Sequence, residues 1–150
     1  MNTSKRYLLC VTLNESDDPV VTQAVDLAKG MGAALEILHV VSPEPDFVGY
    51  TAFMYPGRDE RAEELREEKA ALAALIDKVE QSELKVTGYM KEAPTVAGIL
   101  EFAEKHGHEL ILIGTHTRGI VGTLLMGSVA TDVVKKSKIP VLVVPPPAKA

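Results

Sequence analysis

The stretch LILIGTHTRGIVGTLLMGS, residues 110–128, decides the fold of this chain. Its first four residues are apolar and mostly branched, as in a short strand that is buried on both faces of a parallel sheet. Four glycines follow within fourteen residues, and Ser128 opens a segment of helical period. A glycine-rich turn that ends at a helix N-terminus presents unpaired N–H groups and the positive end of a helix dipole. The stretch therefore predicts a phosphate site, and with it a bound nucleotide.

Length and composition limit the classes of protein to which the chain can belong. It has 150 residues, of which 46% are hydrophobic and 25% charged, and we expect a single globular domain over residues 1–150. A net charge of −5 argues against a nucleic-acid partner. The apolar run near the N-terminus is too short for a membrane span, and no cleavage site follows it. These features predict a cytoplasmic protein without a membrane partner.

The single cysteine, Cys10, lies inside an apolar segment, YLLCVTL. One cysteine can form neither an intramolecular disulfide nor an all-cysteine metal cage. We therefore expect a buried, unreactive thiol.

Apolar strands and amphipathic helices alternate along the whole chain. The predicted strands are 7–13, 35–41, 84–90, 110–113 and 141–144, and the predicted helices are 19–29, 59–82, 95–105 and 128–136. Asp17 or Asp18 is the expected cap of the first helix, and the partly polar third strand is expected at an edge. This alternation predicts an α/β fold with one doubly wound, five-stranded parallel sheet and helices on both faces. Ligands bind such sheets at the carboxyl ends of the strands.

The order of these elements, together with three segments, resembles the universal stress protein family. The segments are LHVV at 38–41, GTHTRGIVGTLLMGSV at 114–129 and KKSKIPVLVVP at 135–145. The resemblance covers nearly the whole chain and implies a sheet of order 3-2-1-4-5. It also implies a regulatory or stress-response protein that binds an adenine nucleotide, ATP, and a homodimer formed through Val141–Val144.

The family's nucleotide signature is Gly, two residues, Gly, nine residues, and Gly followed by Ser or Thr. Gly114 fills the first place, and Gly127 with Ser128 fills the last. Carried over position by position, the resemblance implies that Val40 contacts the base and Gly114 the ribose. It implies that Gly127, Ser128 and Val129 receive the phosphates through backbone N–H groups and the serine hydroxyl.

Two positions depart from the family pattern. Thr117 stands in place of the middle glycine, and a β-branched residue adopts positive φ poorly and narrows the space for a phosphate. Thr12 stands where the family usually carries an aspartate at the end of the first strand, with Asn14 as the nearest polar substitute. A lost charge-assisted hydrogen bond costs ~1.5–3 kcal/mol, so we expect weakened nucleotide binding.

Two side chains of the glycine-rich stretch have two interpretations each. His116 either donates to a phosphate or shapes the turn, and Arg118 either supplies charge to the same place or is a solvated loop residue. A Ser-His-Asp set can be drawn with Ser128, His116 and Asp132, but nothing in the sequence fixes its geometry. Ser128 is therefore expected to cap its helix. At most a slow ATP hydrolysis is expected, and whether Mg²⁺ accompanies the nucleotide stays open.

Other polar residues are predicted to lie outside any site. His106 and His108 lack a third metal ligand nearby and are expected to be solvated, with Gly107 ending the helix before them. The charged run 58–69 is predicted to be a solvent-exposed helix face.

The proline-rich segment 42–56 is the source of a second functional hypothesis. It holds four of the seven aromatic residues, Phe47, Tyr50, Phe53 and Tyr55, together with Met54. This much apolar area is expected to pack on something. The segment either folds over the nucleotide as a lid, pads a dimer or partner surface, or covers the protein's own sheet edge. The alternative to nucleotide binding is thus a nucleotide-free interaction dimer that uses this segment.

Overall fold

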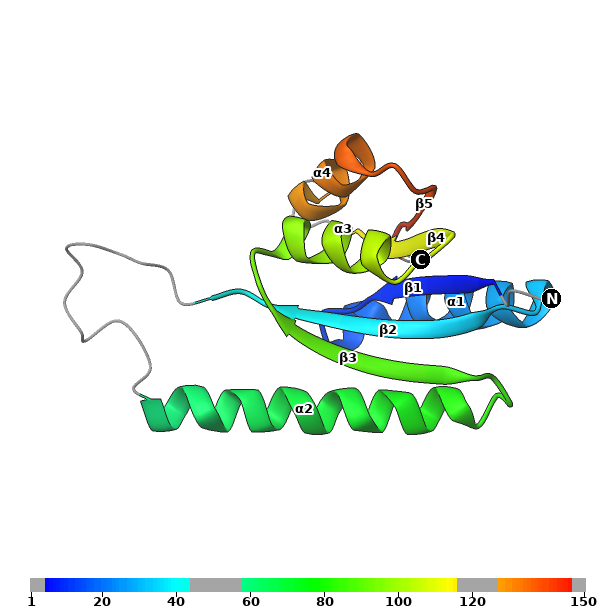
Figure 1. Cartoon of the computed structure of the whole chain (residues 1–150). Coiled ribbons are helices and arrows are strands. Elements are labelled where there is room, and N and C mark those ends of the chain that lie inside the picture. Colours follow the sequence, from blue (N-terminus) through cyan, green and yellow to red (C-terminus); the bar gives the residue numbers. More distant parts are fainter. Residues whose placement is uncertain (1–4, 44–57, 116–126, 147–150) are drawn as a thin grey trace.

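The structure is a computed structural model that describes residues 5–43, 58–115 and 127–146. Its strands form one five-stranded, fully parallel sheet in the order β3-β2-β1-β4-β5 (Figure 1). The strands are β1 (Arg6–Cys10), β2 (Ala34–Val41), β3 (Val86–Glu92), β4 (Leu110–Gly114) and β5 (Val141–Val144). The predicted α/β fold and the order 3-2-1-4-5 are therefore confirmed, and β3 lies at an edge as its polar sequence predicted.

Helices cover both faces of the sheet, as the alternating pattern predicted (Figure 1). On one face lie α1 (Asp18–Met31) and α2 (Arg58–Glu80), and on the other lie α3 (Thr95–Lys105) and α4 (Ser128–Lys136). A short 3₁₀ turn, η1 (Glu15–Asp17), connects the end of β1 with α1. The covered face changes once, between α2 and α3, where the chain returns from β3 to the other side of β1. Because all five strands are parallel, their carboxyl ends lie at one edge of the sheet.

The core consists of two apolar layers, one on each face of the sheet. Leu9 belongs to the layer beneath α1 and α2, and Leu8 belongs to the layer beneath α3 and α4. Both side chains are fully buried. This alternation follows from the period-two geometry of a strand, and burial on both faces explains why β1 contains almost no polar residues.

Several boundaries match the sequence prediction and others do not. The bounds of α3, α4 and β5 agree with the predicted ranges. However, β1 ends at Cys10 rather than at residue 13, because the backbone turns away after Val11 and reaches positive φ at Leu13. Helix α1 ends at Met31, and its C-cap residue Gly32 has a φ of 65°, the left-handed conformation that favours glycine.

Two further predictions concern membrane spans and the segment 42–56. In the part of the chain that the structure describes, no helix combines the length and the apolar character that a membrane crossing requires. The aromatic residues and Met54 of the segment lie outside the described residues, so its three interpretations stay predictions.

Candidate functional site

A cavity of about 270 Å³ lies at the carboxyl ends of the central strands. Strands β1, β2 and β4 form its floor, α3 supplies Thr95 and Ile99, and α4 supplies Val129. Its walls are mostly apolar, with Thr12, Asp17 and His39 as polar groups at the β1 end. A small, largely apolar cavity with few polar groups is typical of ligand sites, and its place agrees with the rule for open parallel sheets.

Four of the predicted nucleotide contacts line this cavity. Thr12, Val40, Gly114 and Val129 come from four different elements or their ends and meet around one space. Gly98 permits the close approach of α3, because a Cβ at this position would lie 3.0 Å from Ala93 and 3.2 Å from Val40. Helix α3 can therefore close the cavity over β2.

The remaining predicted contacts lie around the start of α4 or outside the described residues. Gly127 precedes α4 with a φ of −56° and a ψ of 152°, and its carbonyl accepts from the Thr131 N–H at 2.9 Å. Ser128 is the first residue of the helix and is exposed. The first-turn N–H groups of α4 thus point out of the helix beside Val129. His116, Thr117 and Arg118 lie outside the described residues.

The predicted cap of α4 was wrong. Gly127, not Ser128, is the N-cap residue, and no side-chain cap hydrogen bond is present there. A serine caps only when it precedes the first helical residue, and Ser128 is already inside the helix. Its hydroxyl is therefore not committed to a helix cap.

Thr12 stands in place of the family's aspartate, as the sequence analysis noted, but a carboxylate from further along the chain lies beside it. Asp17 lies only 6% exposed and accepts hydrogen bonds from the backbone N–H groups of Thr12 and Leu13, and from the Thr12 hydroxyl. Asp17 occupies the N-cap position of α1, as predicted, but its side chain makes no cap hydrogen bond there, because it accepts from the end of β1 instead. Asn14, the predicted polar substitute, instead accepts from the Ser16 N–H at 2.9 Å and caps η1.

His39 is a second polar side chain at this edge that the sequence analysis did not assign to the site. It is 8% exposed, and its Nδ1 lies 3.0 Å from the Val11 carbonyl. Because a carbonyl only accepts, Nδ1 carries a proton and donates it. The ring's Nε2 lies 3.4 Å from a carboxylate oxygen of Glu68 in α2, so the imidazole lies between the end of β1 and α2 beside the cavity. The charged run 58–69 is therefore not solvated throughout, since Glu68 turns toward the sheet.

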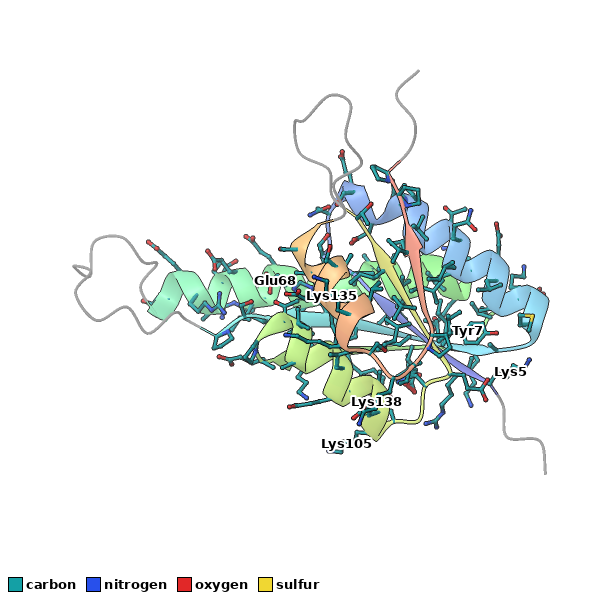
Figure 2. The ribbon with its side chains drawn as sticks, turned by 90° about the horizontal axis from the view of Figure 1, so that it is seen from above. Lys5, Tyr7, Glu68, Lys105, Lys135 and Lys138 are labelled. Carbon is teal, nitrogen blue, oxygen red and sulfur yellow. The ribbon has the colours of Figure 1, made fainter. Side chains whose placement is uncertain are left out.

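In Figure 2, Glu68 lies apart from Lys5, Lys105 and Lys138. Lys5 precedes β1, Lys105 ends α3 and Lys138 precedes β5, so each of them lies on the side of the sheet where the strands begin. These three lysines are therefore not part of the lining of the cavity at the carboxyl ends of the strands.

The prediction that His106 and His108 are solvated was wrong. His108 is 4% exposed, and its Nε2 lies 2.8 Å from a carboxylate oxygen of Glu36 in β2. Burial lowers the pKa of His108, against the opposing effects of the hydrogen bond and charge of Glu36. His106 is half-buried, and its ring centroid lies 4.1 Å from that of Phe102. Gly107 has the positive φ, 68°, that a helix-ending glycine adopts.

Two remaining candidate chemistries were tested by the structure. Cys10 is buried, as predicted, and burial raises its thiol pKa to about 12, which makes it unreactive at neutral pH. Over residues 5–43, 58–115 and 127–146, no cluster of three or more His, Cys, Asp or Glu side chains is arranged to hold a metal ion.

The chain is similar in sequence to a family of known proteins. The model of the Universal stress protein family matches residues 3–145. This chain belongs to the universal stress protein family. A universal stress protein of Methanocaldococcus jannaschii is 36% identical over 128 residues, which cover 84% of this chain and 73% of that protein.

Solved structures of universal stress proteins have the same fold. One, in complex with cAMP, superposes with a TM-score of 0.70 at 18% identity over 95% of this chain and 98% of that chain. Another, from Archaeoglobus fulgidus in complex with dAMP, gives 0.67 at 18% identity over 96% and 99%. At this identity the likeness concerns the fold alone.

Proposed function

We propose that this universal stress protein is a cytoplasmic, regulatory, single-domain protein that binds an adenine nucleotide, ATP, in the cavity at the carboxyl ends of β1, β2 and β4. The observation that carries the proposal is the meeting of Thr12, Val40, Gly114 and Val129 around one cavity beside the start of α4. Universal stress proteins in complex with cAMP and dAMP support adenine as the base.

The cavity offers a different environment to each end of a nucleotide. Val40, Ile99 and Val129 give apolar walls that suit a flat base. The first turn of α4 gives outward N–H groups and the positive end of the helix dipole, which suit phosphates. The base thus lies toward β2 and α3, and the phosphates extend toward Gly127 and Ser128.

We expect the purified protein to carry an adenine nucleotide or to bind ATP with micromolar affinity. Heat denaturation should release any bound ATP, ADP or AMP into the supernatant for chromatography. The emptied protein should then be titrated with ATP by calorimetry, with and without Mg²⁺. Protein that is empty and gives no heat up to millimolar ATP would overturn the proposed function.

We also propose that two copies of the chain associate through β5. This strand lies at an edge of the sheet, and Leu142 at its centre is 38% exposed. Val134 of α4 adds a further exposed apolar side chain, 44% exposed. An apolar edge strand with unpaired N–H and C=O groups is a template for pairing with a second copy. The net charge of −5 favours such a protein partner over nucleic acid.

Leu142→Lys should convert the dimer into a monomer at tens of micromolar, because a lysine on an edge strand opposes strand pairing. Light scattering measures the mass directly. Met31→Lys is the matched control, since Met31 is a 47% exposed apolar residue at the end of α1, away from β5. A wild-type monomer, or a variant that stays dimeric, would contradict this interface.

A further inference from the structure

We infer that Asp17 is a positioning residue of the cavity, and that it makes the Thr12 hydroxyl a hydrogen-bond acceptor toward the ligand. The ligand group that faces Thr12 must then be a donor, such as a hydroxyl or an amino group, and cannot be a phosphate. This inference rests on the proposed function, because it assigns a chemical preference to one end of the same nucleotide cavity.

Asp17 gathers the donors of three successive residues. Its Oδ1 accepts from the Thr12 N–H at 3.0 Å and from the Thr12 hydroxyl at 2.9 Å. Its Oδ2 accepts from the N–H groups of Thr12 at 3.0 Å, Leu13 at 2.7 Å and Asn14 at 3.3 Å. Such a concave set of backbone N–H groups is an anion site, and here the chain's own carboxylate occupies it.

The same contacts fix the backbone at the end of β1. Leu13 adopts a φ of 65°, which a non-glycine residue reaches only at a cost. The 2.7 Å bond from its N–H to Asp17 holds it there, and the side chain of Asn14 fixes the following turn. Thr12 is therefore presented in one orientation, with its side chain exposed at the rim of the cavity.

The direction of the hydrogen bond decides what Thr12 offers to a ligand. An ionised carboxylate only accepts, so the single hydroxyl proton of Thr12 is committed to Asp17. The lone pairs of the hydroxyl oxygen remain for the cavity, and they require a donor. Phosphate oxygens at neutral pH are acceptors, and the buried negative charge of Asp17 repels them as well.

ATP carries three suitable donors, which are the 6-amino group, the 2′-hydroxyl and the 3′-hydroxyl. Calorimetric titration should compare ATP with ITP, 2′-deoxy-ATP and 3′-deoxy-ATP, each of which lacks one of them. We expect one analogue to bind wild-type protein about tenfold more weakly than ATP does. In Thr12→Val, ATP and that analogue should bind within twofold of each other, because the acceptor has gone.

Asp17→Asn supplies the second variant. Its amide nitrogen would face the converging N–H groups, so the carboxamide cannot satisfy them all and Thr12 loses its fixed orientation. The analogue that binds wild-type protein more weakly than ATP should lose less affinity relative to ATP in Asp17→Asn. In Asp18→Asn this loss should be the same as in wild type. Asp18 is the matched control because it is exposed and begins α1. Equal affinity of the wild-type protein for all four nucleotides would overturn the donor requirement. So would a Thr12→Val variant in which the weaker analogue still loses as much affinity relative to ATP as in wild type.

Hydrogen exchange of the nucleotide-free protein tests the positioning role separately. The amides of Leu13 and Asn14 should exchange at least tenfold faster in Asp17→Asn than in wild type, with Ile37 in the core as the reference for global unfolding. Asp18→Asn should leave these rates unchanged. Unchanged rates in Asp17→Asn would overturn the role of Asp17. A wild-type protein that binds none of the four nucleotides would contradict the proposed function and the donor requirement, while the exchange rates would still decide the positioning.

Discussion

His108→Leu is expected to lower the free energy of unfolding by about 3 kcal/mol, because it leaves the Glu36 carboxylate buried without its donor. The His108 side chain is 0% exposed, the Glu36 side chain is 10% exposed, and their atoms lie 2.8 Å apart. Leucine fills most of the space of the imidazole, so the loss arises from the orphaned carboxylate rather than from a cavity. Urea unfolding at pH 7.5 measures the difference.

Two control variants separate this pair from its surroundings. His106→Leu should cost less than ~1 kcal/mol, because His106 is half-buried and stacks on Phe102 without a described ion-pair partner. The double variant Glu36→Leu/His108→Leu should recover most of the loss, because no unpaired polar group then remains. A single His108→Leu that costs no more than His106→Leu would contradict the expected result.

The pH dependence of stability provides a further readout of the same pair. Burial lowers the pKa of His108 in the folded protein, so the unfolded chain takes up this proton first. The contribution of His108 to stability is present above its unfolded pKa, about 6.5. It is lost as the pH falls from there toward the folded value. This loss should be absent in the double variant.

The layer architecture could be predicted because it depends on local pattern. The apolar runs of β4 and β5 and the helical periods of α3 and α4 each carry their signal within a few residues. The sheet order came from the resemblance to a family rather than from periodicity, since periodicity does not say which strands are neighbours.

The polar contacts could not be predicted because they join residues that are distant along the chain or compete for one role. Glu36 and His108 are separated by 72 positions, and only the register of the sheet brings them together. Next to Gly107, His108 has the sequence context of a solvated loop. Asp17 lies at a position typical of a helix cap, which hides its contacts with β1. The spacing of Asn14 and Asp17 is that of a capping box, and this spacing could have predicted that the Asp17 side chain accepts from the preceding backbone.

The candidate site could be predicted in part. Val40 and Gly114 were assigned through the family resemblance, and the common edge at which parallel strands end explains why both line one cavity. His39 was missed because a histidine within an apolar strand carries no sign of its partner, which is Glu68 on another element.

Ser128→Glu is expected to lower the affinity for ATP roughly a hundredfold without destabilising the protein. Ser128 is exposed at the first position of α4, where the interaction of an acidic side chain with the helix dipole stabilises the folded protein by ~0.3–1 kcal/mol. The new carboxylate would lie where the proposed function places the phosphates. Two charges ~5 Å apart at an effective dielectric constant of about 20 repel by about 3 kcal/mol, which corresponds to this loss of affinity.

The ligand itself supplies the sharpest control for this variant. Adenosine lacks phosphates, so its affinity for the variant should change by less than about twofold. The affinity for ATP should fall, and high salt should restore part of it by screening the repulsion. Ala97→Glu adds the same charge to the exposed first turn of α3 and should leave ATP binding unchanged. If Ser128→Glu weakens adenosine and ATP equally, the variant distorts the cavity. If ATP affinity is unaffected, the phosphates do not lie at α4, because no orientation that places them there escapes the added charge.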